Sequence, residues 1–86
     1  MKIAFHKNFE KKFKKLDQKI KKLFIKRLKL FTERPFSKEL NNHALKGKFT
    51  GYRSINVSGD IRAIFKFISD DLVEFDDIDN HSNLYS

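Results

Sequence analysis

His43, His81 and Asp60 are the titratable side chains of this 86-residue sequence with the greatest catalytic potential. An imidazole can donate or accept a proton near neutral pH, because its unperturbed pKa is about 6.5. Two histidines can therefore serve as the general base and the general acid of a transesterification. RNA supplies its own nucleophile, the 2′-hydroxyl group, so such a reaction needs no metal ion and no cofactor. A ribonuclease is thus one candidate activity.

Two arginines and two tyrosines accompany these groups. Arg53 and Arg62 could hold the phosphate, since a planar guanidinium matches two of its oxygens. Tyr52 and Tyr85 could stack on bases or donate a hydrogen bond. Other interpretations stay open: the histidines also suit surface positions, and Arg62 could pair with the acidic end of the chain.

Two further features of the candidate residues bear on the chemistry. Ser58-Gly59-Asp60 is a typical turn sequence, so Asp60 also has a purely structural interpretation. His43, His81 and Asp60 lack the local spacing of metal ligands, and the chain has no cysteine. No metal site, no cofactor and no disulfide are therefore predicted.

The positive charge is concentrated in the first two thirds of the chain. Residues 1–34 hold 13 Lys and Arg against 3 Asp and Glu, and residues 35–68 hold 6 against 2. Residues 69–86 hold none against 6, and the net charge is +8. Such a basic surface suits nucleic acid, an anionic membrane or an acidic protein. A solvated lysine-rich helix face is the alternative.

Length and hydropathy restrict the class of protein. We expect residues 1–86 to form a single domain, which buries about 60% of the surface of its unfolded chain. No apolar run approaches the roughly 20 residues of a membrane span. The first residues have no signal-peptide core. We therefore expect a soluble cytoplasmic protein that does not bind membranes.

The first half of the sequence predicts a strand and two helices. Lys2–His6 alternates between polar and apolar residues, which predicts a short strand at a sheet edge. Asn8 and Asp17 are expected to cap the two helices. The second helix must end before Pro35, because a proline disfavours helical geometry at the preceding residue. Its apolar face, which we expect to cover a sheet, holds Ile20, Leu23, Phe24, Leu28 and Phe31. Its opposite face holds Lys19, Lys22, Lys26 and Lys29.

The second half predicts a β-meander. Tyr52–Val57, Ile61–Ile68 and Leu72–Ile78 alternate and are joined by two short turns. The connection from Pro35 to Asn42 has little regular signal, and Leu40 is expected to anchor it. The predicted fold is α+β, with an N-terminal strand and a two-helix hairpin on one face of a small antiparallel sheet. The other face of the sheet is expected to be open to a substrate.

Four short motifs, in their order and spacing, resemble the RelE/ParE toxin superfamily and most closely its YafQ-like branch. They are His43-Ala-Leu-Lys-Gly47, Gly51-Tyr52-Arg53, Gly59-Asp60-x-Arg62 and His81-Ser-x-Leu-Tyr85. The resemblance extends over the whole chain. It implies the toxin of a type II toxin–antitoxin pair, a metal-independent mRNA interferase that cuts mRNA in the ribosomal A site. It also implies an acidic antitoxin protein as the partner, beside mRNA and ribosomal RNA.

The resemblance also assigns roles to residues. It implies that His43, Asp60, His81 and Tyr85 are catalytic, Tyr85 as the terminal aromatic that touches the substrate. Basic positions of the superfamily that contact phosphate correspond to Arg53 and Arg62, and Lys46 and Lys48 are further candidates for RNA phosphate contacts.

The sequence departs from the YafQ-like pattern at three places. Asn56 stands where a second strand histidine is common, and is a candidate auxiliary residue. Ile61 stands where an aromatic is common, and Asp79-Asn80 precede His81 in place of small residues. Two alternatives to the nuclease stay open, the first because the ParE branch shares the fold and the second because of Asn56. One is a ParE-like, non-enzymatic toxin that inhibits DNA gyrase, and the other is a catalytically weak RNA-binding relic of the fold.

Overall fold

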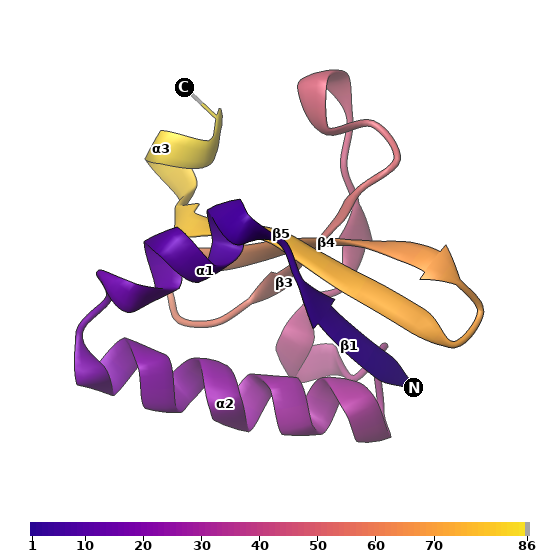
Figure 1. The fold of residues 1–86 in the computed structure, drawn as a ribbon, viewed down its shortest axis with the longest axis horizontal. Helices are drawn as coiled ribbons and strands as arrows, with labels where there is room; N and C mark the ends of the chain where they lie inside the picture. The colour runs from indigo at the N-terminus through magenta and orange to yellow at the C-terminus, as the bar shows by residue number, and fades with distance from the viewer. Residues whose placement is uncertain (86) are drawn as a thin grey trace.

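The computed structural model describes residues 1–85, and it has the predicted α+β fold (Figure 1). Within these residues one five-stranded sheet has the strand order β1-β5-β4-β3-β2. Its strands are β1 (Lys2–Phe5), β2 (His43–Ala44), β3 (Arg53–Asn56), β4 (Ile61–Ser69) and β5 (Leu72–Asn80). The helices are α1 (Lys7–Lys14), α2 (Gln18–Glu33) and α3 (His81–Tyr85), with short 3-10 turns η1 (Lys38–Leu40) and η2 (Gly47–Phe49).

The sheet contains the predicted antiparallel meander of β3, β4 and β5. It is not wholly antiparallel, however, because β1 pairs in parallel with β5, with Ile3 opposite Val73. An alternating pattern is the same for a parallel and an antiparallel strand, so the sequence of β1 could not indicate the direction in which it pairs. Two short elements were also not predicted. They are β2, which pairs with β3, and the five-residue helix α3.

The capping of the two long helices was predicted correctly at one of two positions. The Asp17 side chain accepts a hydrogen bond from the amide of Ile20 at 2.9 Å and caps α2. The prediction that Asn8 caps α1 is wrong. His6 is the cap, and its Nδ1 accepts from the amide of Asn8 at 3.0 Å. The Asn8 side chain instead donates to the carbonyl of Asp76 at 3.0 Å, which ties α1 to β5.

The hydrophobic core lies between α2 and the sheet and is rich in phenylalanine. Its fully buried rings include Phe24 and Phe31 of α2, Phe65 of β4 and Phe75 of β5. Phe75 contacts the other three, with ring centroids 5.3–5.6 Å apart. Each buried phenylalanine contributes about 1.5–3 kcal/mol relative to exposure. Leu40 is fully buried, so the prediction that it anchors the connection is confirmed.

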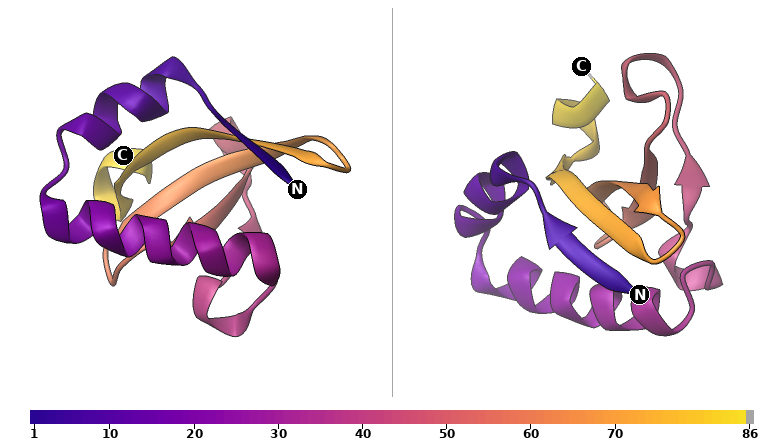
Figure 2. Two further views of the ribbon diagram at one scale, coloured as in Figure 1. Left: turned by 60° about the horizontal axis from the view of Figure 1, so that its bottom comes forward. Right: turned by 45° about the vertical axis from the view of Figure 1, so that its right-hand side comes forward.

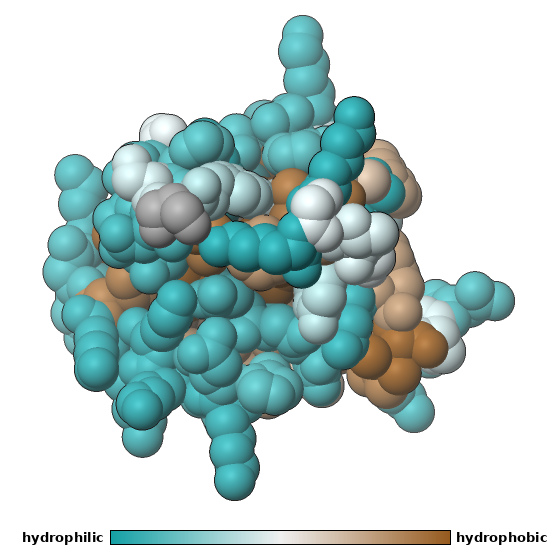
Figure 3. Space-filling model, turned by 90° about the horizontal axis from the view of Figure 1, so that it is seen from above, coloured by the Kyte–Doolittle hydropathy of each residue, from teal (hydrophilic) through white to brown (hydrophobic). Residues whose placement is uncertain are grey.

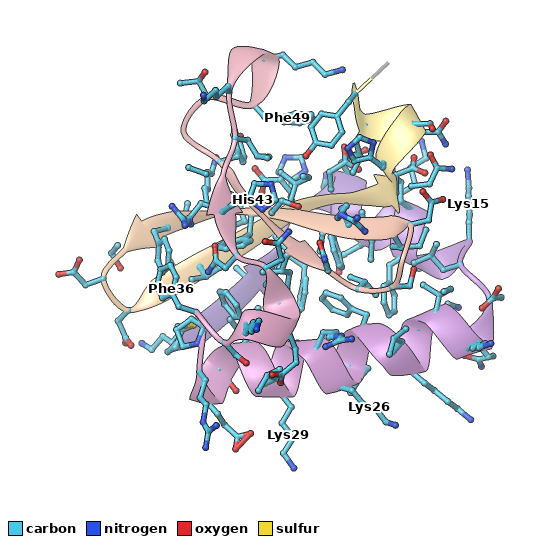
Figure 4. All side chains as sticks on the ribbon, turned by 180° about the vertical axis from the view of Figure 1, so that it is seen from behind. Lys15, Lys26, Lys29, Phe36, His43 and Phe49 are labelled. Carbon is cyan, nitrogen blue, oxygen red and sulfur yellow. The ribbon has the colours of Figure 1, made fainter. Side chains whose placement is uncertain are left out.

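The two faces of the sheet are covered differently. Helix α2 spans the core side, and its Lys26 and Lys29 project away from the sheet (Figure 4). On the opposite side rise α3 and the loop that contains η2 (Figures 1 and 2). This second face was expected to be open, but it is partly covered, and Ile64 of β4 and Leu84 of α3 are buried outside the main core. The reason is that β4 carries apolar residues on both faces.

None of the helices in residues 1–85 is both long enough and apolar enough to cross a membrane.

Candidate functional site

A polar pocket of about 310 Å³ lies on the sheet face away from α2. Its lining residues are Asn41, His43, Leu45, Ser54, Arg62, His81 and Tyr85. The pocket therefore brings together four of the candidate residues named from the sequence, His43, Arg62, His81 and Tyr85. The molecular surface seen from this side is largely hydrophilic (Figure 3). A hollow of about 290 Å³ beside α1 and α2 is lined mainly by apolar residues and offers no comparable set of groups.

Strand pairing positions the floor and one wall of the pocket. His43 of β2 is directly opposite Ser54 of β3, and Ser54 is opposite Ile64 of β4. Directly paired residues carry their side chains on the same face of a sheet. Arg62 reaches the same face, because it lies two residues before Ile64 on β4 and strand side chains alternate.

The hydrogen bonding of His43 fixes its tautomer. Nδ1 lies 2.7 Å from the carbonyl oxygen of Asn41. A carbonyl can only accept, so Nδ1 must carry the hydrogen atom. In the neutral imidazole the lone pair is then on Nε2, the nitrogen that a general base uses. Asn41 itself adopts a left-handed backbone conformation with φ of 48°, which turns the chain into β2.

His81 is the first residue of α3, and its backbone amide donates to the carbonyl of Asp60 at 3.0 Å. The side chain of Asn80 caps the helix by accepting from the amide of Asn83 at 2.7 Å. The imidazole of His81 lies against the ring of Tyr85, with centroids 4.7 Å apart and planes tilted by 53°. Tyr85 in turn meets Phe49 edge to face at 5.9 Å, so α3 contacts the η2 loop (Figure 4).

Arg62 is held by the turn that precedes its strand. Its Nη1 donates to the carbonyls of Ser58, Gly59 and Ile61 at 3.0, 3.3 and 3.2 Å. Within residues 1–85, the guanidinium donates its hydrogen bonds to these three carbonyls. One end of the group is thus anchored, and the alternative of an ion pair with the acidic C-terminal residues is not formed within residues 1–85.

Four other candidate residues do not line the pocket. Asp60 is exposed and contributes its carbonyl to α3. Asn56 is paired with Arg62 across β3 and β4, and its Oδ1 is buried without a partner in the described part of the chain. Lys46 precedes η2 and is exposed, and Lys48 is exposed with its Nζ 5.4 Å from the ring centre of Phe49.

Arg53 does not line the pocket that contains Arg62. Arg53 alternates with Ser54 and shares its face with the buried Ile55, so it points to the helix side of the sheet. There its Nε donates to Asn42 Oδ1 at 2.8 Å, and its guanidinium lies 5.4 Å from the ring centre of Phe36.

Sequence reasoning missed Ser54, Asn41 and Leu45 as lining residues. Of these, Ser54 had a detectable signal. It alternates with Ile55 in the predicted strand, so the same period of two that buries Ile55 in the core turns Ser54 to the opposite face. The position of Asn41 depends on its left-handed conformation, which the sequence did not indicate.

Two acidic residues near His81 share an ion pair with one lysine from α1. Lys12 Nζ lies 2.8 Å from Asp77 Oδ1 and 3.2 Å from Asp79 Oδ2. Burial alone would raise the pKa of Asp79, but hydrogen bonds from Asn83, from the Asn80 amide and from Lys12 outweigh it and lower this pKa. Burial also opposes the charge of Lys12, whereas the bonds to Asp77 and Asp79 raise its pKa.

No group of three or more His, Cys, Asp or Glu side chains in residues 1–85 is arranged to hold a metal ion.

Comparison with known proteins identifies the family. The sequence profile described as "Bacterial toxin of type II toxin-antitoxin system, YafQ" matches residues 1–86. YafQ from E. coli strain BL21(DE3) has a similar fold, with a TM-score of 0.82, 23% identity, and coverage of 98% of this chain and 97% of that one. A YoeB/ParE toxin from Agrobacterium tumefaciens has a TM-score of 0.77 and 18% identity, with coverage of 94% of this chain and 99% of that one. YafQ in an E. coli DinJ–YafQ complex has a TM-score of 0.69 and 24% identity, with coverage of 98% of this chain and 97% of that one. No match was found among curated protein sequences. Because the profile spans the whole sequence, the chain belongs to the YafQ family of bacterial toxins of type II toxin–antitoxin systems.

Proposed function

We propose that this toxin is an endoribonuclease that cuts mRNA by attack of the 2′-hydroxyl on the adjacent phosphate. The observation that carries the proposal is the polar pocket, in which His43, Arg62, His81 and Tyr85 come together from β2, β4 and α3. Two imidazoles and a guanidinium are the groups that a metal-independent transesterification requires.

In this mechanism His43 is the general base. Its Nε2 is the unprotonated nitrogen of the neutral imidazole, because Nδ1 donates to the Asn41 carbonyl. Nε2 takes the proton of the 2′-hydroxyl group as the 2′-oxygen attacks phosphorus. The bond from phosphorus to the 5′-oxygen breaks, and a 2′,3′-cyclic phosphate is formed.

His81 is the general acid and donates a proton to the leaving 5′-oxygen. Its position at the start of α3, beside the ring of Tyr85, leaves the imidazole exposed to solvent and able to exchange that proton. Arg62 stabilises the negative charge that develops on the phosphate oxygens, since charge-assisted hydrogen bonds are the stronger kind. Tyr85 offers a ring on which a neighbouring base stacks.

We further propose that the cut takes place within the ribosome. The pocket and the exposed lysines of α2 lie on opposite sides of the molecule, so the toxin can hold mRNA and ribosomal RNA at once (Figure 4). The net charge of +8 favours such phosphate contacts and makes them sensitive to salt.

An acidic antitoxin is the second partner that we propose. Structures of similar fold include a DinJ–YafQ complex from E. coli and a YoeB–YefM complex from Staphylococcus aureus. A basic toxin surface complements an acidic protein and speeds the encounter. The test is whether a neighbouring gene encodes a small acidic protein that co-purifies with the toxin, and loss of cleavage on adding that protein is expected.

The nuclease proposal is tested by mapping mRNA 5′ ends in a translation reaction with and without the toxin. New ends within translated codons are expected with the wild-type chain and not with a His43→Gln, His81→Gln double variant. The same RNA without ribosomes separates ribosome-dependent from free cleavage. The absence of new ends, or cuts unchanged in the double variant, would contradict the proposal. Inhibition of DNA supercoiling by gyrase would instead support the ParE-like alternative.

A further inference from the structure

Ser54 is a buried polar residue whose hydroxyl group has no hydrogen-bond partner in residues 1–85. The residue is fully buried, and its Oγ exposes less than 1 Å². An unsatisfied buried hydroxyl destabilises a folded protein, because the water that hydrated it in the unfolded chain has not been replaced. The hydroxyl of Ser54 therefore has no structural benefit in the ligand-free molecule.

The location of this hydroxyl suggests what satisfies it. Ser54 lines the polar pocket together with His43, Arg62 and His81. It is directly opposite His43 across the β2–β3 pair, so the two side chains stand side by side on the pocket face. A buried donor in the floor of a pocket that gathers cationic and acid–base groups is placed to meet a substrate oxygen.

Other serines show what a structural hydroxyl does in this fold. Ser58 Oγ accepts from the amides of Asp60 and Ile61 at 3.3 and 3.0 Å. Ser69 Oγ accepts from the amide of Asp71 at 3.4 Å in the β4–β5 turn. Both stabilise turns, whereas Ser54 lies within a strand whose backbone is already paired on both sides.

We propose that Ser54 is a substrate-binding residue, whose Oγ donates a hydrogen bond to a non-bridging oxygen of the phosphate held by Arg62. This inference rests on the proposed ribonuclease function and adds a residue to its site. Because this hydroxyl is buried in the ligand-free molecule, the contact forms with a small local opening of the pocket around Ser54 on binding.

The test compares Ser54→Ala with Ser69→Ala, which removes a hydroxyl from the distant turn. Ser54→Ala is expected to lower cleavage roughly 10- to 100-fold, as for loss of a hydrogen bond to a charged group. Its melting temperature is expected to equal or exceed that of the wild type, because an unsatisfied polar group is removed. Ser69→Ala is expected to cleave normally and to melt no higher than the wild type.

Binding is measured separately with a short RNA that carries a 2′-deoxy nucleotide at the cut and so cannot react. Wild-type toxin is expected to bind it more tightly than Ser54→Ala by a similar factor. Normal cleavage and normal affinity in Ser54→Ala would overturn the inference, and so would a lower melting temperature, which would show a structural role. If the wild type binds the 2′-deoxy RNA but does not cleave the same RNA with all its 2′-hydroxyl groups, the ribonuclease proposal fails. The ratio of the affinities of the wild type and Ser54→Ala for the 2′-deoxy RNA then still decides whether Ser54 binds substrate.

Discussion

Lys12 Nζ on α1 lies 3.2 Å from Asp79 Oδ2 at the end of β5, although 67 positions separate the two residues. The other oxygen of Asp79 accepts from the side-chain amide of Asn83 on α3 at 3.0 Å. Asp79 therefore joins α1 to the short helix that carries His81. A five-residue helix has too few internal hydrogen bonds to be stable alone, so it depends on tertiary contacts, of which these are two.

Replacing Lys12 by methionine is expected to loosen α3 and to reduce RNA cleavage. Methionine keeps the apolar stem and removes the charge that pairs with Asp79. Hydrogen exchange at the Leu84 amide should become faster, and kcat should fall more than the affinity for RNA. Lys12→Arg should restore both. Lys11→Met, on the same helix, is the control for a general loss of positive charge, and an equal effect of the two methionine variants would refute a specific role for Lys12.

Asp79 should also make the stability of the fold depend on pH. Its pKa is lowered in the folded state, so its ionised form stabilises the protein. This contribution is present above the pKa of the unfolded chain and is lost as the pH falls through the lower folded value. The unfolding free energy of the wild type should thus drop in acid more than that of Asp79→Asn, as measured by urea denaturation between pH 7 and pH 2. Parallel curves for the two proteins would count against this assignment.

How far the sequence predicted the fold depended on the length of each pattern. The meander and the two long helices were predicted because each repeats its apolar period over several residues. Helix α3 was not predicted, since five residues show no period. Strand β1 could have paired at either edge of the sheet and in either direction. Its parallel pairing with β5 depends on contacts between the two strands, which the sequence of β1 alone does not indicate.

The candidate site was predicted in part, for a related reason. The motifs gave residue types, and the pairing of β2 with β3 then brought His43 to the face that Arg62 occupies. Arg53 shares a motif with Gly51 and Tyr52, but strand alternation sets it beside Ile55 on the core side. Asp60 belongs to the motif, but it contacts the site through its backbone carbonyl, which accepts from the His81 amide. The spacing of the motif did not indicate this role.

The two pocket histidines should be separable from the third histidine of the chain by their effect on cleavage. His43→Gln and His81→Gln should each reduce kcat by about 10²–10⁴-fold, the usual range for loss of a general base or acid. Glutamine at position 43 can still donate to the Asn41 carbonyl, so the loop should remain folded. His6 caps α1 and does not line this pocket, so His6→Gln should reduce kcat far less than either pocket variant. Equal activity in all three variants would exclude imidazole catalysis.

Arg62 and Arg53 should respond differently to the same substitution. Arg62→Lys keeps the charge but loses the planar fork, so we expect cleavage to fall by about tenfold or more. Arg53→Lys should retain cleavage and lose the bond to Asn42 and the contact with Phe36. A loss of about 1 kcal/mol would lower its melting temperature by roughly 4–8 °C in a domain of this size. If Arg53→Lys abolished cleavage without a change in melting temperature, Arg53 would belong to the site after all.

Glu74 and Asp76 form a carboxylate pair beside Lys66, and this pair should limit stability at neutral pH. The hydrogen bond with Asp76, followed by burial, raises the pKa of Glu74, while Lys66 at 3.7 Å opposes the shift only partly. A raised carboxyl pKa favours the folded state below the unfolded value, and this advantage is lost as the pH rises through the folded value.

Glu74→Gln removes the ionisation and keeps the shape of the side chain. It should therefore melt at a higher temperature than the wild type at pH 7. The difference should vanish in acid, where Glu74 of the wild type is itself neutral. Glu39→Gln, at an exposed position in η1, controls for the change in net charge. A lower melting temperature for Glu74→Gln at pH 7 would mean that attraction to Lys66 exceeds the repulsion by Asp76.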